Sequence, residues 1–175
     1  MDFEKTLRMV DDFFGLHGQP WALAGAAALS SYGLARATQD LDFVADAGFQ
    51  SELVAHLESA GYRTLYRSAG YSNHLHADAA LGRLDFIYVG GDTSRRLFEE
   101  CREGVFAGRP VRVPRPEHLA AMKVQAMKND PERRLQDLAD IRFLMGVPGV
   151  NEQEVRGYFE GAGLLEDFDE LHRTP

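Results

Sequence analysis

Three aspartates in apolar surroundings have the residue type and spacing to carry out chemistry. Asp40 and Asp42 lie in "QDLDFVA", and Asp85 lies in "GRLDFIYV". Both stretches have the apolar residues of buried strands, and residues two apart in a strand point to the same face of a sheet. Asp40 and Asp42 are therefore expected side by side, where like charges repel unless a positive group lies between them.

A divalent cation would supply such a positive group. Three carboxylates on neighbouring strands are one way in which proteins hold Mg²⁺ or Mn²⁺ ions for phosphoryl chemistry. The alternative is that the aspartates lie at strand ends, in solvent or paired with Arg36 or Arg83. His74 and His76 are expected at the surface of a strand, because no further ligand at metal-binding spacing accompanies them.

A glycine at a junction between a strand and a helix is the second feature. In "LAGAAALSSYG", Gly25 follows an apolar strand and precedes a short helix. A glycine there lets the backbone approach a phosphate. Close packing would explain the same residues, and the sequence contains neither a G-x-G-x-x-G fingerprint nor a P-loop. The glycine junction alone therefore does not indicate a phosphate-binding site, and the motifs that follow it are needed for that prediction.

The elements that must position these residues are expected from hydrophobic periodicity and from glycine and proline signals. Strands are expected at 20–25, 39–45, 62–68, 72–78 and 82–90, with a hairpin at 105–114. Helices are expected at 3–15, 26–33, 49–61, 93–104, 117–128, 132–145, 152–161 and 164–171. This order predicts an α+β fold with a small mixed or antiparallel sheet flanked by helices. We expect an α/β core over 1–115 and a C-terminal helical bundle over 116–175.

Composition narrows the class of protein. The 175 residues carry a net charge of −8, which argues against a general binder of nucleic acids. Arg109, Arg112 and Arg115 are expected on one solvated face of the hairpin, where they could form a local basic rim for RNA. The single cysteine, the short apolar runs and the lack of a signal pattern at the N-terminus predict a cytoplasmic protein without a membrane partner.

The order of the motifs resembles the nucleotidyltransferase superfamily, which has the polymerase-β-like fold. The family pattern is a hydrophobic residue, Gly and Gly or Ser, then about a dozen residues, then Asp–hydrophobic–Asp/Glu–hydrophobic. Here it is "LAGAAALSSYGLARATQDLDFV", and Asp85 would be the later, lone aspartate. "GLARATQDLDF" and "VPRPEHLAAMKVQAMKNDPERRLQDLADIRFLM" are especially similar to minimal bacterial members related to AbiE-type toxins. The resemblance spans about residues 20 to 145.

The resemblance implies transfer of a nucleoside monophosphate from an NTP to an acceptor hydroxyl on a tRNA 3′ end, a protein or a small molecule. Asp40, Asp42 and Asp85 would hold Mg²⁺ or Mn²⁺, and Asp85 would also act as the base. The resemblance assigns nucleotide binding to Gly25, Ala26, Ser30, Arg36, Thr38, Lys123 and Asp137. It also implies a role in a toxin–antitoxin pair, with a cognate antitoxin as partner.

Several assignments have alternatives. Ala26 stands where the family has Gly or Ser, which removes a hydroxyl but leaves the backbone N–H. Lys123 could be a solvated residue at the border of a packed face, and Asp137 could pair with arginines on a helix surface. A non-catalytic module that binds a nucleotide or a partner, and a two-metal hydrolase or nuclease, are the alternative functions.

Overall fold

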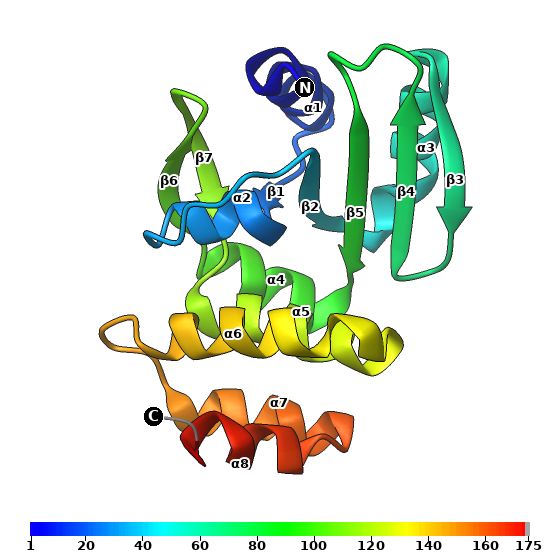
Figure 1. Cartoon of the computed structure of the whole chain (residues 1–175). Helices are drawn as coiled ribbons and strands as arrows, with labels where there is room; N and C mark the ends of the chain where they lie inside the picture. Colours follow the sequence, from blue (N-terminus) through cyan, green and yellow to red (C-terminus); the bar gives the residue numbers. More distant parts are fainter. Residues whose placement is uncertain (174–175) are drawn as a thin grey trace. The chain divides into compact units, whose positions relative to one another are not determined.

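The computed structural model describes residues 1–173, and the chain divides into two compact units, Met1–Pro114 and Arg115–Pro175. The first unit mixes strands and helices, and the second is helical (Figure 1). None of the helices described is long and apolar enough to cross a membrane.

A five-stranded mixed sheet forms the centre of the first unit. Its order is β1-β2-β5-β4-β3; β2 and β5 are parallel, and the other neighbours are antiparallel. The strands are β1 (Trp21–Leu23), β2 (Asp40–Asp46), β3 (Tyr62–Arg67), β4 (Tyr71–His76) and β5 (Arg83–Val89). This architecture confirms the predicted α+β fold with a small mixed sheet.

One face of this sheet carries the core of the first unit. Leu41 and Phe43 of β2 and Leu84 and Phe86 of β5 are fully buried, and the rings of Phe43 and Phe86 stack with centroids 5.0 Å apart. The helices of this unit are α1 (Phe3–Leu16), α2 (Gly25–Ser30), α3 (Gln50–Ser59) and α4 (Gly91–Glu99), with a short 3-10 turn at Ala47–Phe49. The alternation along β2 and β5 leaves the aspartates on the opposite face.

The hairpin of β6 (Arg102–Phe106) and β7 (Arg109–Val113) forms a separate two-stranded sheet. The helix predicted over 93–104 is therefore too long, because α4 ends at Glu99. Gly104 pairs with Val111, and a Cβ at Gly104 would lie only 2.9 Å from Val113 Cγ2. Pairing with a strand later in the chain outweighs the local helical pattern.

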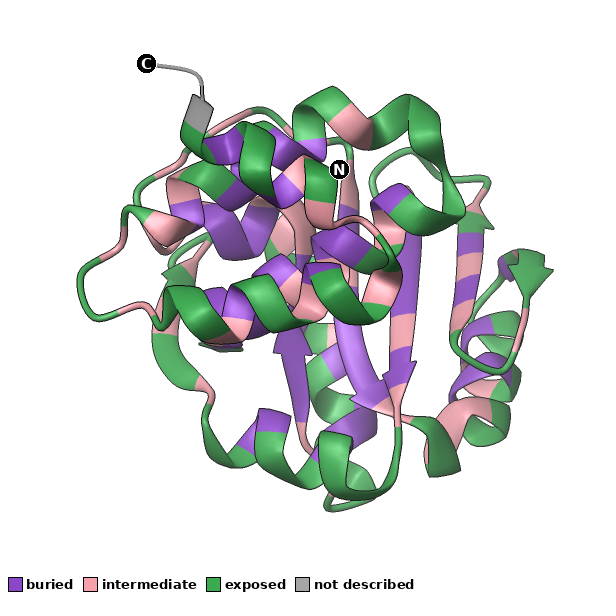
Figure 2. Cartoon of the chain, turned by 90° about the horizontal axis from the view of Figure 1, so that it is seen from below, coloured by how far each residue is buried: buried purple, intermediate pink, exposed green. Residues whose placement is uncertain are grey.

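The second unit consists of α5 (Pro116–Asn129), a 3-10 turn at Pro131–Arg133, α6 (Arg134–Met145), α7 (Glu152–Ala162) and α8 (Leu165–Arg173). The predicted helices are confirmed to within a few residues. Figure 2 shows buried and exposed residues alternating along the helices, as amphipathic packing requires. Val124, Ile141 and Phe159 are buried, and the rings of Phe159 and Phe168 meet edge to face at 5.5 Å.

His74 is fully buried in β4, so the prediction that it lies at the strand surface is wrong. Its Nδ1 lies 3.1 Å from Thr64 Oγ1, and its Nε2 lies 2.8 Å from Ser72 Oγ. Ser72 Oγ is also 2.7 Å from the hydroxyl of Tyr88. A histidine beside two hydroxyls can be buried because its ring nitrogens have partners.

We expect the protein to lose stability when the pH falls below about 6.5. Burial lowers the pKa of His74, so the unfolded chain binds a proton there before the folded chain does. The free energy of unfolding should then fall with a slope of at most about 1.4 kcal/mol per pH unit from this residue. Urea unfolding between pH 5.5 and 7.5 measures this, and a His74→Gln variant with an equally steep acid slope would contradict it.

Candidate active site

The carboxylates predicted from the sequence lie on one face of β2 and β5, opposite the face that carries the core. In the parallel register Asp42 lies opposite Asp85, and Asp40 lies opposite Arg83. Residues in register on neighbouring strands point to the same side of the sheet. The two aspartates of β2 therefore lie beside Arg83 and Asp85 of β5. The structure thus brings Asp40, Asp42 and Asp85 to one face, as predicted, and adds a guanidinium beside them.

The junction between β1 and α2 lies against Asp42. Gly25 begins α2 with φ +55°, and a Cβ there would lie 2.6 Å from Asp42 Cγ and overlap its Oδ2. The backbone N–H of Ala24 donates to the Asp42 carbonyl at 2.8 Å. Only glycine combines this backbone conformation with this close approach. Gly25 is therefore required by the position of a carboxylate on the next strand.

The other predicted nucleotide contacts of the first unit lie in α2 and the loop that follows it. Thr38 Oγ1 lies 2.8 Å from Asp40 Oδ1, so it holds the first carboxylate of the pair. Ser30 Oγ donates to the Ala27 carbonyl at 2.7 Å within α2. Ala26 is partly exposed in the first turn of that helix, and Arg36 lies partly exposed in the loop before β2.

Asp85 is held by Arg83, the alternative partner named from the sequence. Arg83 Nε donates to Asp85 Oδ1 at 2.8 Å, and its Nη2 donates to Oδ2 at 3.1 Å. The hydroxyl of Tyr71 lies 3.5 Å from Arg83 Nη2. The hydrogen bond to Asp85 raises the pKa of Arg83, and burial raises the pKa of Tyr71 to about 12. The guanidinium of Arg83 therefore stays charged and the hydroxyl of Tyr71 stays protonated at neutral pH.

The donor set suits a hard cation in part. Carboxylate oxygens are the ligands that Mg²⁺ prefers, and Asp40 and Asp42 present two carboxylates from one strand. Within residues 1–173, however, no three His, Cys, Asp or Glu side chains form a cluster that could hold a metal ion. Asp85 does not complete such a cluster, and both of its oxygens accept hydrogen bonds from Arg83.

In the second unit, Lys123 and Asp137 form a buried ion cluster. Lys123 Nζ lies 2.7 Å from Asp137 Oδ1 and 2.7 Å from Asp140 Oδ2. Asp137 has no exposed side-chain surface, so the expected surface location is wrong, although its expected ion pair with Arg133 is present. Arg133 Nε lies 3.3 Å from Asp137, whereas Arg134 pairs with Asp167 and Glu170 instead.

Asp140 is the member of this cluster that sequence reasoning left out of the site. It follows Asp137 by three residues on α6, a spacing that places two side chains on the same face of a helix. This spacing is the feature of the sequence that could have placed Asp140 beside Asp137 in the cluster. Lys123 and both aspartates come from α5 and α6, so the cluster links these two helices.

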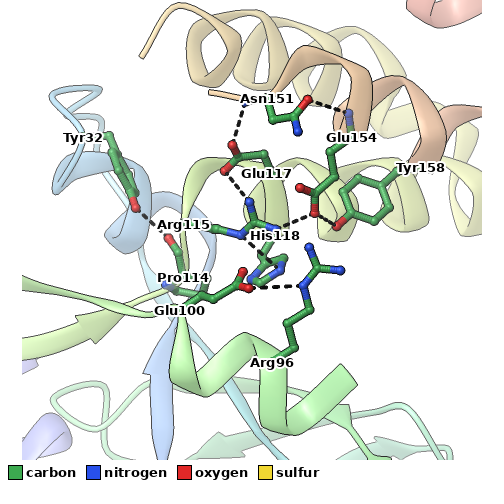
Figure 3. A network of polar contacts seen from close by, with 10 residues as sticks. All are labelled: Tyr32, Arg96, Glu100, Pro114, Arg115, Glu117, His118, Asn151, Glu154 and Tyr158. Atoms are coloured by element: carbon green, nitrogen blue, oxygen red, sulfur yellow. Dashed lines mark hydrogen bonds and ion pairs between the residues drawn. The ribbon is translucent and has the colours of Figure 1, made fainter. Parts of the chain in front are cut away.

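The hairpin arginines do not form one solvated basic face. Arg109 lies 3.9 Å from Asp11, and Arg112 donates to the Phe98 carbonyl at the end of α4. Figure 3 shows Arg115 between two glutamates of the second unit: its guanidinium lies 3.5 Å from Glu117 and 2.5 Å from Glu154. Each arginine therefore has a local acceptor, which is a carboxylate for Arg109 and Arg115 and a backbone carbonyl for Arg112.

The fold of this chain, with its mixed sheet, carboxylate face and glycine junction, is similar to the folds of solved nucleotidyltransferases. The antibiotic-resistance factor ANT(2'')-Ia has a similar solution structure, with a TM-score of 0.68 and 18% identity over 99% of this chain and 98% of that chain. Its complex with adenylyl-2''-tobramycin gives a TM-score of 0.64 and 19% identity over 92% and 94%. Lincomycin-bound LnuA, a lincosamide antibiotic adenylyltransferase, gives 0.57 and 17% over 82% and 97%.

No protein-family model and no curated protein matches the chain. At these levels of identity the similarity to solved structures shows the fold. The predicted fold is thereby confirmed, whereas membership of the superfamily and the AbiE-type relationship stay predictions.

Proposed function

We propose that this chain is a nucleotidyltransferase that transfers a nucleoside monophosphate from an NTP to a hydroxyl group of a small molecule. The observation that carries the proposal is the placement of Asp42, which lies against Gly25 on one side and in register with Asp85 on the other. A backbone that can approach a phosphate, a pair of carboxylates and a further carboxylate for the acceptor are thus adjacent.

The nucleotide would bind at the junction of β1 and α2. Gly25 lets the backbone approach the phosphates, and the N–H of Ala26 remains a donor although the hydroxyl of a serine is lost. Asp40, oriented by Thr38, and Asp42 are the residues that would hold Mg²⁺ or Mn²⁺. The cation would neutralise charge on the transferring phosphate and on the departing pyrophosphate.

Asp85 would accept the proton of the acceptor hydroxyl. The oxygen of that hydroxyl forms a bond to the α-phosphorus, the bond to pyrophosphate breaks, and the proton passes to the carboxylate of Asp85. Arg83 fixes the direction of this carboxylate through two hydrogen bonds. Most of the rate would come from positioning and electrostatic stabilisation on a rigid sheet.

A small-molecule acceptor has the best support. One similar structure is a complex with adenylyl-2''-tobramycin, and another has lincomycin bound. Arg109 and Arg112, which were expected to form a rim for RNA, contact Asp11 and the Phe98 carbonyl instead. A cytoplasmic location is part of this proposal, because NTPs are supplied there. The AbiE-type resemblance would instead make RNA or protein the acceptor and an antitoxin the partner.

A binding module without catalysis is the second candidate. The fork of Arg83 on Asp85 favours it, because both carboxylate oxygens already accept hydrogen bonds from the guanidinium. Ala26 also favours a binding module, because it lacks the hydroxyl that a serine would supply at this position. Such a module would bind NTP without releasing pyrophosphate.

The test is incorporation of label. The purified protein is incubated with each α-labelled NTP and Mg²⁺ or Mn²⁺, in separate reactions with tobramycin, lincomycin, total RNA and total protein. Label on a small molecule supports the proposal. Label on RNA or protein would show that the acceptor is RNA or protein and not a small molecule. No incorporation with any nucleotide, together with measurable NTP binding, would favour the binding module.

A further inference from the structure

We propose that the open face of β4 and β3, next to Asp85, binds the acceptor through a saturated ring that carries hydroxyl or amino groups. The inference rests on the proposed function and extends it, because it assigns an acceptor surface and a class of acceptor. The surface consists of Tyr66, Tyr71, Asn73 and Leu75, which we call the acceptor face.

Strand register places the acceptor face beside the carboxylates. Asp85 of β5 lies opposite Asn73 of β4, and Asn73 lies opposite Tyr66 of β3. Since Asp42 is in register with Asp85, these four residues form one row across β2, β5, β4 and β3. The neighbouring row runs from Asp40 through Arg83 and Leu75 to Arg63. Both rows therefore point to the same open face of the sheet.

The direction of the reaction selects the β4 side of Asp85 for the acceptor. The phosphates would lie toward β2, where Gly25 approaches Asp42. In an in-line displacement the attacking oxygen lies opposite the leaving pyrophosphate. An acceptor whose hydroxyl reaches Asp85 must therefore extend away from β2, across β4 and β3.

The side chains of the acceptor face have the chemistry to bind a hydroxylated ring. Tyr66 is 56% exposed and Leu75 is 38% exposed, so an apolar surface is open to a ligand. The rings of Tyr66 and Tyr71 lie with centroids 6.2 Å apart and offer aromatic faces to C–H groups. Such aromatic faces suit a saturated ring.

Asn73 gives this surface a hydrogen-bond acceptor that lacks a donor. Its Oδ1 is buried and accepts no hydrogen bond from the described residues. An unpaired buried amide oxygen is costly, and a ligand that donates to it recovers that cost. The missing donor predicts a hydroxyl or amino group on the ring, one strand away from the carboxylate that would take the proton.

Arg83 joins the acceptor face to the proposed base. Its Nη2 lies 3.1 Å from Asp85 Oδ2 and 3.5 Å from the hydroxyl of Tyr71. A ring that packs on Tyr71 would thus lie beside the guanidinium that orients Asp85. Binding at the acceptor face and positioning of the base share one side chain.

The experiment titrates the ¹⁵N-labelled full chain, with Mg²⁺ and a non-hydrolysable ATP analogue, with tobramycin and separately with lincomycin. We expect amide shifts concentrated in 62–67 and 71–76 for at least one probe. Tyr66→Ala and Asn73→Ala should each raise the Kd by roughly threefold to tenfold. Val105→Ala, at an exposed apolar residue of the separate hairpin, should leave the Kd unchanged, and the dispersion of each spectrum shows that the variant is folded.

Failure of this inference differs from failure of the proposed function. Shifts confined to other elements, no binding by either probe, or wild-type Kd values in both acceptor-face variants would overturn the inference. Binding on β3 and β4 without transfer of label would keep the acceptor face and reject the enzyme. Transfer of label with an unchanged KM for the acceptor in Tyr66→Ala would keep the enzyme and reject the acceptor face.

Discussion

Asp42→Asn is expected to lower kcat for nucleotidyl transfer by about a hundredfold to a thousandfold while the chain stays folded. Asparagine keeps the shape of the side chain and removes its negative charge. The carboxylate lies where a Cβ on Gly25 would have to be, in register with Asp85, and at the point where phosphate charge must be balanced. The loss should therefore appear in the rate of transfer rather than in stability.

A matched control lies on the same strand. Asp46 ends β2, and its side chain accepts from the Gly48 N–H at 2.8 Å and from Ser94 Oγ at 2.5 Å. Asp46→Asn should cost about 1 kcal/mol of stability and leave kcat unchanged. The two variants are compared by release of labelled pyrophosphate and by Mn²⁺ affinity without substrate. Equal kcat values in Asp42→Asn and the wild type would remove Asp42 from the site.

Lys123→Met is expected to destabilise the second unit by roughly 3–5 kcal/mol. The variant removes the ammonium that lies 2.7 Å from both Asp137 and Asp140, whose side chains are almost completely buried. A buried carboxylate that loses its nearest cation keeps the cost of desolvation and loses much of the compensating attraction, even though Arg133 still lies 3.3 Å from Asp137. We therefore expect a structural role for Lys123 whether or not it also reaches a nucleotide.

Urea unfolding of the full chain measures this effect, with Lys128→Met as the control on the same helix. Lys128 is exposed near the end of α5, so its variant should change stability by no more than about 0.5 kcal/mol. Replacing Asp137 and Asp140 by asparagine in the Lys123→Met background should recover part of the loss. If Lys123→Met is as stable as Lys128→Met but has a raised KM for NTP, the phosphate contact is the dominant role.

Local patterns were enough for the candidate carboxylates and for most elements of the fold, although the helix predicted over 93–104 ran into β6. The spacing of Asp40 and Asp42 places them on one face of any strand, whatever its partner. The apolar periodicity of the last third predicts helices without reference to a sheet. Gly25 stands at its junction for a reason that is partly local, since its φ of +55° disfavours other residues.

The register of strands far apart in the chain decided how these residues meet. The pairing of β2 with β5 sets Asp42 opposite Asp85 and Asp40 opposite Arg83, and a shift by one residue would have put Asp85 on the other face. The same pairing leaves Asp85 within the fork of Arg83. It also carries the row of facing residues on to Asn73 and Tyr66.

Burial was the other property that local patterns could not supply. His74 and Asp137 both have the sequence surroundings of surface residues, yet both are fully buried, because hydroxyls from other residues and an ammonium from the preceding helix satisfy them. By itself the sequence determined which residues could do chemistry and which elements carry them. The tertiary structure decided their neighbours, since strand pairing and burial depend on contacts between residues distant in the chain.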